Sequence, residues 1–210
     1  MKKWYDDLRK GDHAAHIFKS EAEQSKVIMD LIAWMDEGEK LVLLSDRWEA
    51  MRKYPRSRVI EAALEDDHME VVPAKENLVT SGRFRAEALI DLINMEFNRA
   101  MDEGHSGLVM SWDLDWLSRE PLDFEAHIVQ QSKLMLSSLP RNLTLLGQYG
   151  LGNFSSIQVE RVLQVNQLVL EDGRLNRNFW VVSTSTIGGP PRDIRTVPSY
   201  RPQADSVRVK

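Results

Sequence analysis

The feature that most constrains the fold is an alternation between short apolar runs and longer segments with helical periodicity. Nearly continuous apolar runs occur at Lys40–Ser45, Gly107–Trp112 and Leu143–Tyr149. Such runs are typical of parallel strands that are buried on both faces of a sheet. An earlier run, His13–Phe18, reads as a short first strand. The sequence therefore predicts an α/β fold: three layers, with a mostly parallel, doubly wound sheet between two layers of helices.

Helical periodicity marks the segments between these strands. The first helix is predicted to begin after Ser20, whose hydroxyl can cap the first turn, while Glu23 three residues later completes a capping box. Further helices are predicted at Trp48–Lys53, Ser57–Leu64, Arg83–Glu103, Leu122–Ser137 and Ser155–Leu163. Additional strands are predicted at Met69–Val72 and, around a turn at residues 171–173, at Gln164–Leu170 and Asn178–Ser183.

Composition limits the classes of function. The 210 residues include no cysteine, which excludes disulfides, thiolate metal sites and cysteine nucleophiles and agrees with a reducing cytosol. The formal net charge of -5 does not favour binding to nucleic acid or to anionic membranes. No apolar run approaches the ~20 residues of a membrane-spanning helix, so we expect a cytoplasmic protein without a membrane partner.

The segment of residues 184–210 differs from the rest of the chain. It is rich in glycine, proline and arginine and has no apolar periodicity. We predict a single domain over residues 8–183, followed by a flexible tail. The alternative is that the tail is a basic arm that docks on a partner or on nucleic acid.

The junction between the first strand and the first helix bears on nucleotide hydrolysis. In P-loop proteins, the backbone N–H groups of a glycine-rich turn at this junction surround the phosphates, and a lysine forms an ion pair with them. Residues 18–23 instead read FKSEAE, without glycine. Glu21 and Glu23 complement the helix dipole but would repel a triphosphate. The sequence thus predicts that no phosphate binds at this junction, and we expect no cofactor.

Short motifs in a fixed order carry a resemblance to a known family. They are Gly11-Asp12-His13, Gly38-Glu39, Ser81-Gly82-Arg83-Phe84, Gly104-His105-Ser106-Gly107, Phe124-Glu125 and Gln148-Tyr149. This ordered set, over roughly residues 8–170, resembles the MEDS domain, a sensory domain named for methanogens and methylotrophs. The resemblance implies a RecA/KaiC-like fold without the phosphate loop. It also implies a signal-input role for small hydrocarbon derivatives, coupled to a transcriptional or kinase output.

The chain departs from that family at two places. The family often has a cysteine before the Gln-Tyr pair and an acidic residue after it, where this chain has Gly147 and Gly150. The acidic residue that often precedes the strand-end tryptophan is displaced to Asp113 and Asp115, which follow Trp112. If those groups set the ligand chemistry in relatives, the ligand of this chain differs from theirs.

Five residues are candidates for a ligand site. His13 lies at the first strand, Trp112, Asp113 and Tyr149 lie at strand ends, and Glu125 lies in a helix. Open α/β sheets bind ligands at the carboxyl ends of their strands, so we predict an enclosed, partly apolar pocket near Trp112, Asp113 and Tyr149. For each of them, core packing, capping or solvent exposure is the competing explanation.

Two of the candidates raise specific alternatives. His16 lies an odd number of residues after His13, which places the two rings on opposite faces of a strand and argues against a shared metal. Glu125, if buried, needs a partner, for which Arg83 and His13 are the candidates.

The sequence thus favours a non-catalytic, self-associating sensory domain. It would bind a small-molecule ligand and act on a signalling or transcriptional output protein. The alternative is an ATPase-like or metal-dependent enzyme with an atypical site at Asp113 and Asp115, because a strand-end aspartate holds Mg²⁺ in ATPases.

Overall fold

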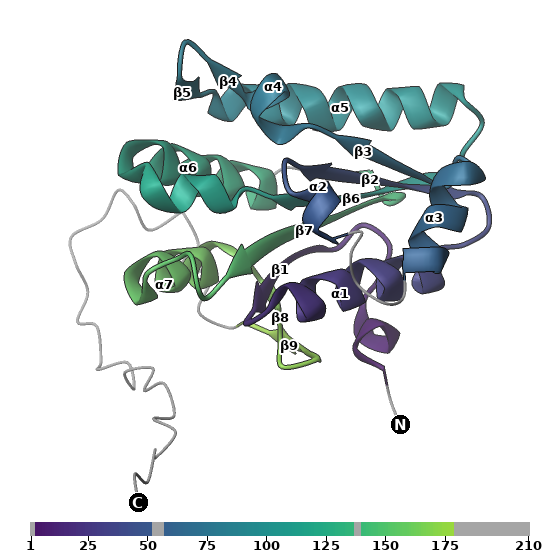
Figure 1. Cartoon of the computed structure of the whole chain (residues 1–210), viewed down its shortest axis with the longest axis horizontal. Helices are drawn as coiled ribbons and strands as arrows, with labels where there is room; N and C mark the ends of the chain where they lie inside the picture. The colour runs from purple at the N-terminus through teal and green to yellow at the C-terminus, as the bar shows by residue number, and fades with distance from the viewer. Residues whose placement is uncertain (1–2, 52–56, 137–139, 179–210) are drawn as a thin grey trace, which may run out of the picture.

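The centre of the fold is a seven-stranded sheet with the strand order β3-β2-β6-β7-β1-β8-β9 (Figure 1). The computed structural model describes residues 3–51, 57–136 and 140–178. The strands of this sheet are β1 (His13–Phe18), β2 (Glu39–Ser45), β3 (Met69–Val72), β6 (Gly107–Asp113), β7 (Leu143–Gly150), β8 (Leu168–Glu171) and β9 (Arg174–Arg177). Neighbouring strands pair in parallel, except for β8 with β9.

Helices cover both faces of the sheet, which confirms the predicted three-layer α/β class (Figure 1). One face packs against η1 (Trp4–Asp7), α1 (Glu21–Trp34), α2 (Trp48–Met51) and α3 (Ser57–Glu65). The other packs against α4 (Ala74–Leu78), α5 (Ala86–Asp102), η2 (Asp115–Arg119), α6 (Pro121–Leu136) and α7 (Ser156–Val165). Successive strand residues point to opposite faces, so each strand supplies both cores: Leu41 and Leu43 belong to the α1 side, and Val42 and Leu44 to the α6 side.

The first helix begins as predicted. The Ser20 hydroxyl accepts a hydrogen bond from the Glu23 backbone N–H at 3.3 Å. The Glu23 carboxylate accepts from the backbone N–H of Lys19 at 2.7 Å, one residue before the position that a capping box requires. The predicted Ser20 cap is therefore confirmed, but the predicted capping box is not closed, because Glu23 bonds to Lys19 instead of Ser20.

Loss of this cap has a defined expected effect. Ser20→Ala should lower the free energy of unfolding by about 1 kcal/mol, because one backbone donor of the first turn loses its partner. Urea unfolding measures this loss, and Ser20→Asp, which restores an acceptor, should recover most of it. An unchanged stability for the alanine variant would show that the hydrogen bond contributes nothing.

The predicted helix at Arg83–Glu103 is wrong at its start. Val79–Thr80 (β4) and Arg83–Phe84 (β5) form a small antiparallel hairpin, and α5 begins only at Ala86. The turn residues Ser81 and Gly82 have positive φ angles of 53° and 75°. Such a two-residue turn matches the twist of a hairpin and is incompatible with continuing helix.

The strand that follows the predicted terminal turn begins earlier than predicted. Asp172 and Gly173 form the predicted turn, with φ angles of 49° and 69°, and β9 follows it at once. The pairing of Leu168 with Arg177 then completes the hairpin before Asn178. The first predicted strand is shorter as well, because α7 extends to Val165.

Other sequence predictions fall outside the described residues. Residues 179–183, the domain boundary at 183 and the tail at residues 184–210 all do so, and these predictions stay untested. Within the described part of the chain, no helix combines the length and apolarity needed to cross a bilayer.

Candidate functional site

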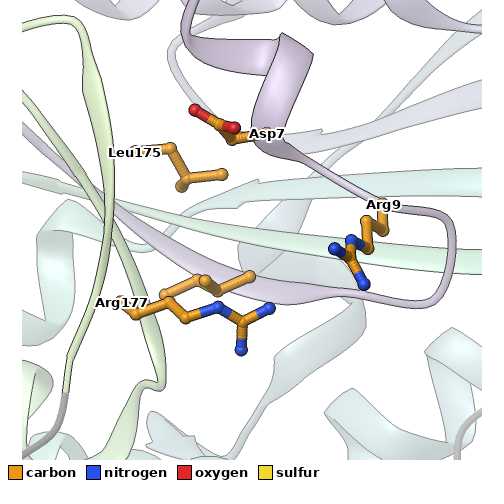
Figure 2. A pocket seen from close by; sticks show the side chains of 5 residues that line it. Asp7, Arg9, Leu175 and Arg177 are labelled. Carbon is orange, nitrogen blue, oxygen red and sulfur yellow. The ribbon is translucent and has the colours of Figure 1, made fainter.

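A surface pocket lies at the amino edge of the sheet, away from the predicted site. Its volume is about 220 Å³, and it is lined by Asp7, Arg9, Leu168, Leu175 and Arg177 (Figure 2). Leu168 begins β8 and Arg177 ends the antiparallel β9, so both lie at the amino ends of the parallel strands. None of the five candidate residues lines this pocket.

The structure separates the candidate residues into three places. His13, Trp112 and Tyr149 lie on the α6 side of the sheet. Asp113 follows Trp112 on the same strand and therefore points to the α1 side, where it contacts Gln24 of α1. The prediction of one pocket near Trp112, Asp113 and Tyr149 is thus wrong. Trp112 and Tyr149 lie on one side of the sheet, and Asp113 points to the other.

Glu125 lies at the surface of α6. Its side chain is 51% exposed and pairs with Arg161 of α7 at 3.0 Å. Neither predicted partner contacts it, since Arg83 pairs with Asp123 at 3.1 Å. Exposure on this scale makes the ion pair weak.

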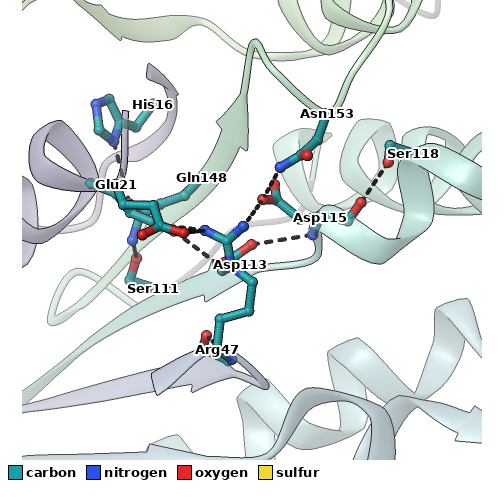
Figure 3. Close-up of polar contacts among 11 residues, drawn as sticks. His16, Glu21, Arg47, Ser111, Asp113, Asp115, Ser118, Gln148 and Asn153 are labelled. Atoms are coloured by element: carbon teal, nitrogen blue, oxygen red, sulfur yellow. Dashed lines mark hydrogen bonds and ion pairs between the residues drawn. The ribbon is translucent and has the colours of Figure 1, made fainter. Parts of the chain in front are cut away.

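A polar cluster lies at the carboxyl ends of β2, β6 and β7 (Figure 3). We call it the Arg47 cluster; its members are Gln24, Arg47, Asp113, Asp115 and Asn153. These residues come from segments that are far apart in the sequence, and the order of the parallel strands brings them together. Ligand sites of open α/β folds lie at this edge.

The guanidinium of Arg47 is the centre of this cluster. Its Nε lies 3.3 Å from Asp113 Oδ2, and its Nη1 lies 2.8 Å from Asp115 Oδ2. Its Nη2 donates to Gln24 Oε1 at 3.1 Å, and Gln24 Nε2 donates to Asp113 Oδ2 at 2.9 Å. The Asp113 and Asp115 side chains are only 1% and 8% exposed. One arginine therefore pairs with two buried carboxylates.

The same cluster shifts the titration of Asp115. Burial and, secondly, the neighbouring Asp113 charge raise the pKa of this carboxyl to about 6, although Arg47 opposes both. Asn153 Nδ2 also donates to Asp115 Oδ2. The site is therefore a network in which one guanidinium pairs with two carboxylates, rather than an open pair of carboxylates.

A second cluster lies under α6, on the opposite face of the sheet. We call it the α6 cluster; its members are His13, Trp112, His127, Gln131 and Tyr149. Each residue is at most 6% exposed. The His13 and Trp112 ring centroids are 5.7 Å apart, and His127 Nε2 shares a hydrogen bond of 3.0 Å with Tyr149 Oη.

Much of the hydrogen-bonding capacity of the α6 cluster is unused. Within the described residues, none of six buried polar atoms makes a hydrogen bond of good geometry: both ring nitrogens of His13, Nδ1 of His127, Nε1 of Trp112 and both amide atoms of Gln131. Gln131 nevertheless lies beside His13, and Trp112 lies beside Tyr149. Burial lowers the pKa of His13 to about 4, which Gln131 partly opposes. Burial, and secondly the nearby His13, lowers the pKa of His127 to about 3. Both imidazoles are therefore neutral at physiological pH.

Gly147 makes room for two members of this cluster. A Cβ at this position would lie 2.8 Å from Trp112 Nε1 and 2.9 Å from Tyr149 Oη. These distances are too short for a real contact. The Trp112 indole and the Tyr149 phenol can therefore occupy their positions only because residue 147 has no side chain. This is the position at which the family resemblance predicts a cysteine.

Overpacking at Gly147 has a measurable consequence. Gly147→Ala should lower the free energy of unfolding by roughly 1–3 kcal/mol, because the fully buried Trp112 and Tyr149 must move. Gly152→Ala is the matched control, since a Cβ there meets nothing within 4 Å. Equal urea-unfolding midpoints for the two variants would contradict the packing described.

Sequence reasoning missed five of these residues, namely Gln24, Arg47, Asn153, His127 and Gln131. His127 and Gln131 occupy the buried stripe of α6 together with Phe124, Ile128 and Leu134. Polar residues on an apolar stripe at helical spacing are the signal that could have identified them. Arg47 carries no such signal, because its partners come from α1, the end of β6 and η2.

The described residues contain one group with three possible metal ligands, namely Asp67, Glu103 and His105. It is exposed or half-buried, and the Lys40 ammonium already lies 3.3 Å from Asp67 and 2.8 Å from Glu103. This internal cation satisfies the acidic group, so we infer no metal site from it.

The sequence model of the MEDS family, described as the methanogen/methylotroph, DcmR sensory domain, matches residues 12–167. This match covers most of the chain and includes every member of both clusters. The chain belongs to the MEDS family. No curated protein matches this MEDS domain in sequence.

Solved structures are similar to this MEDS domain in fold. The Pyrococcus horikoshii OT3 protein PH0250 has a TM-score of 0.54 at 6% identity, over 85% of this chain and 91% of its own. At so low an identity, this likeness shows the fold alone. The cytoplasmic domain of EssC (10% identity) and EssC ATPases 2 and 3 from Geobacillus thermodenitrificans (9%) each have a TM-score of 0.38. They match 91% and 90% of this chain but only 36% of their own length.

Proposed function

We propose that this MEDS domain is a non-catalytic sensor of small molecules, with simple hydrocarbon derivatives as the ligand class. Membership of a sensory family supports a sensing role. The observation that carries the non-catalytic part is the position of Arg47 between Asp113 and Asp115. A catalytic metal at these carboxylates would have to displace a guanidinium that both of them already bind.

The start of α1 supports the same conclusion. Glu21 and Glu23 lie in its first turn, where a P-loop protein binds phosphate on free backbone N–H groups. The Glu21 carboxylate lies 3.9 Å from Arg47 Nη2, so the negative charge of this turn faces the Arg47 cluster. A triphosphate at this position would meet two carboxylates of α1 in addition to Asp113 and Asp115.

As a sensory domain, the protein needs an output partner. We propose that it acts on a signalling or transcriptional output protein, as a homo-oligomer in the cytoplasm. Light scattering of the purified protein tests the oligomer, and a mass equal to that of one chain over the working concentration range would contradict it.

A steady-state ATPase assay with Mg²⁺ separates the sensor from the alternative enzyme. We expect no turnover above that of buffer, for both the wild type and Asp113→Ala. Turnover that Asp113→Ala abolishes would contradict the proposed function and favour an atypical nucleotide site at Asp113 and Asp115. A calorimetric titration with Mg²⁺-ATP should likewise show no binding heat.

A further inference from the structure

The α6 cluster combines full burial with unused hydrogen-bonding groups. Its residues are 0% to 6% exposed, yet His13, Trp112, His127 and Gln131 all retain polar atoms without partners among the described residues. Buried polar groups are nearly always satisfied in folded proteins, because an unpaired one costs free energy. These atoms lie close together, around the contacts between His13, Trp112 and Tyr149.

The unused groups include both donors and acceptors. Trp112 Nε1–H and the Gln131 NH₂ can donate, and the Gln131 carbonyl can accept. The neutral His13 ring offers one donor and one acceptor nitrogen, whereas His127 offers only Nδ1, because its Nε2 already bonds to Tyr149. The surrounding walls are aromatic: the Phe84 ring centroid lies 5.9 Å from that of His127, and the Phe154 centroid lies 5.6 Å from that of Tyr149. Such a mixture of apolar walls and a few convergent polar groups is typical of small-molecule sites.

We propose that the α6 cluster is the ligand site of this domain and that it binds a small, uncharged molecule which both donates and accepts hydrogen bonds. The inference rests on the proposed sensing function and deepens it by naming the site and the ligand chemistry. Small alcohols and amides belong to this class, whereas saturated hydrocarbons and carboxylates do not.

Charge on the ligand is disfavoured by the composition of the site. Among the described residues, the ring contacts and hydrogen bonds of the five residues involve one another and neighbouring aromatic rings, and none of them involves a charged side chain. A buried charge without a counter-ion is costly. A zinc ion would require three or four protein ligands, usually including a carboxylate or a thiolate beside histidine, and the cluster offers two histidines.

Three probes of the same shape test the ligand class. Acetamide is neutral and both donates and accepts, acetate is its charged isostere, and isobutene is its apolar isostere. Binding is followed by NMR at the Trp112 indole N–H and the His13 ring nitrogens of the intact chain. We expect acetamide to shift both signals with a dissociation constant in the millimolar range, as befits four heavy atoms, and the other two probes to shift neither.

Variants test the location. Gln131→Met keeps the shape of the side chain but removes the amide, and we expect it to weaken acetamide binding at least tenfold. Gly147→Ala places a methyl group between Trp112 and Tyr149 and should abolish the response. Gly152→Ala should bind as the wild type does. If Gly147→Ala does not fold, Gln131→Met still decides the question.

The outcomes separate this inference from the proposed function. Binding of a small molecule that moves neither the Trp112 nor the His13 signal would overturn the site while the sensing function stands. Equal responses to acetate or isobutene, or no response to acetamide, would overturn the ligand class. If no small molecule of a wider panel binds anywhere, the sensing function fails together with the site.

Discussion

Arg47→Met is expected to destabilise the folded protein by roughly 3 kcal/mol near neutral pH. The substitution removes the guanidinium from two carboxylates whose side chains are 1% and 8% exposed. We take the lower end of the range for broken buried ion pairs, because the Arg47 side chain is itself 31% exposed. Urea unfolding measures the loss, which should shrink at lower pH as Asp115 takes up a proton.

Added cation provides a sharper test of the same site. If Arg47 stands where a metal would otherwise bind, millimolar Mg²⁺ should raise the melting temperature of Arg47→Met but not that of the wild type. Arg161→Met is the control, since its pair with Glu125 is exposed and should contribute less than about 1 kcal/mol. Equal losses for the two arginine variants, or a Mg²⁺ effect on the wild type, would contradict the account.

Lowering the pH should destabilise the protein strongly, already at pH values well above the pKa of ordinary carboxylates. Burial lowers the pKa of His13 and His16 to about 4 and that of His127 to about 3. In the unfolded chain these histidines titrate near 6.5, so the unfolded state binds more protons below that pH. Their stabilising contribution is complete above pH 6.5 and is lost as the pH falls toward 4.

Asp115 acts in the opposite direction. Its raised pKa of about 6 means that, between pH 6 and pH 4, the folded state binds a proton that the unfolded state does not bind. The destabilisation caused by the buried, ionised Asp115 therefore decreases as the pH falls from 6 toward 4. Together, the three histidines and Asp115 should lower the free energy of unfolding by roughly 4 kcal/mol between about pH 7 and pH 5. A loss of this size is a large part of the stability of a typical domain.

Urea unfolding at several pH values measures this loss. His16→Gln should reduce it by about 2 kcal/mol, because one of the titrating histidines is removed. Val42→Ala, which truncates a buried apolar side chain, should lower the stability equally at every pH. A stability that is flat between pH 7 and pH 5 would show that these histidines are not buried in the neutral form.

The central strands of the fold were predictable because burial on both faces requires a nearly continuous apolar run in the sequence. Runs such as Lys40–Ser45 are apolar at successive positions, and only a central parallel strand requires this. The helix start at Ser20 was predictable for a similar reason, because its cap is local. The hairpin at Val79–Phe84 was not predicted, since Arg83 and Phe84 continue the apolar and charged spacing of α5.

The candidate site was predicted in part, and its error has a simple physical cause. His13, Trp112 and Tyr149 were identified and do lie together. Asp113 was placed with them although neighbouring strand residues face opposite sides, a rule that the sequence alone could have supplied. Whether any of these residues binds a ligand stays a prediction.

Other parts of the site depend on contacts that no local pattern encodes. Arg47 reaches Asp113 only because β2 pairs with β6, as in the register of Ser45 with Asp113. Several of the family motifs belong to the opposite edge: a Cβ at Gly38 would lie 2.8 Å from Ser106 Oγ, and one at Gly107 would lie 2.9 Å from Glu39 Oε1. These motifs therefore close the amino ends of β2 and β6 and do not line either cluster.

Native mass spectrometry of the protein as purified tests the central claim most directly. The account predicts a small neutral adduct on the wild type and on Gly152→Ala, and its loss from Gly147→Ala, whose added methyl group occupies the α6 cluster. An adduct with the mass of a nucleotide and Mg²⁺, or the same small adduct on all three proteins, would contradict the account.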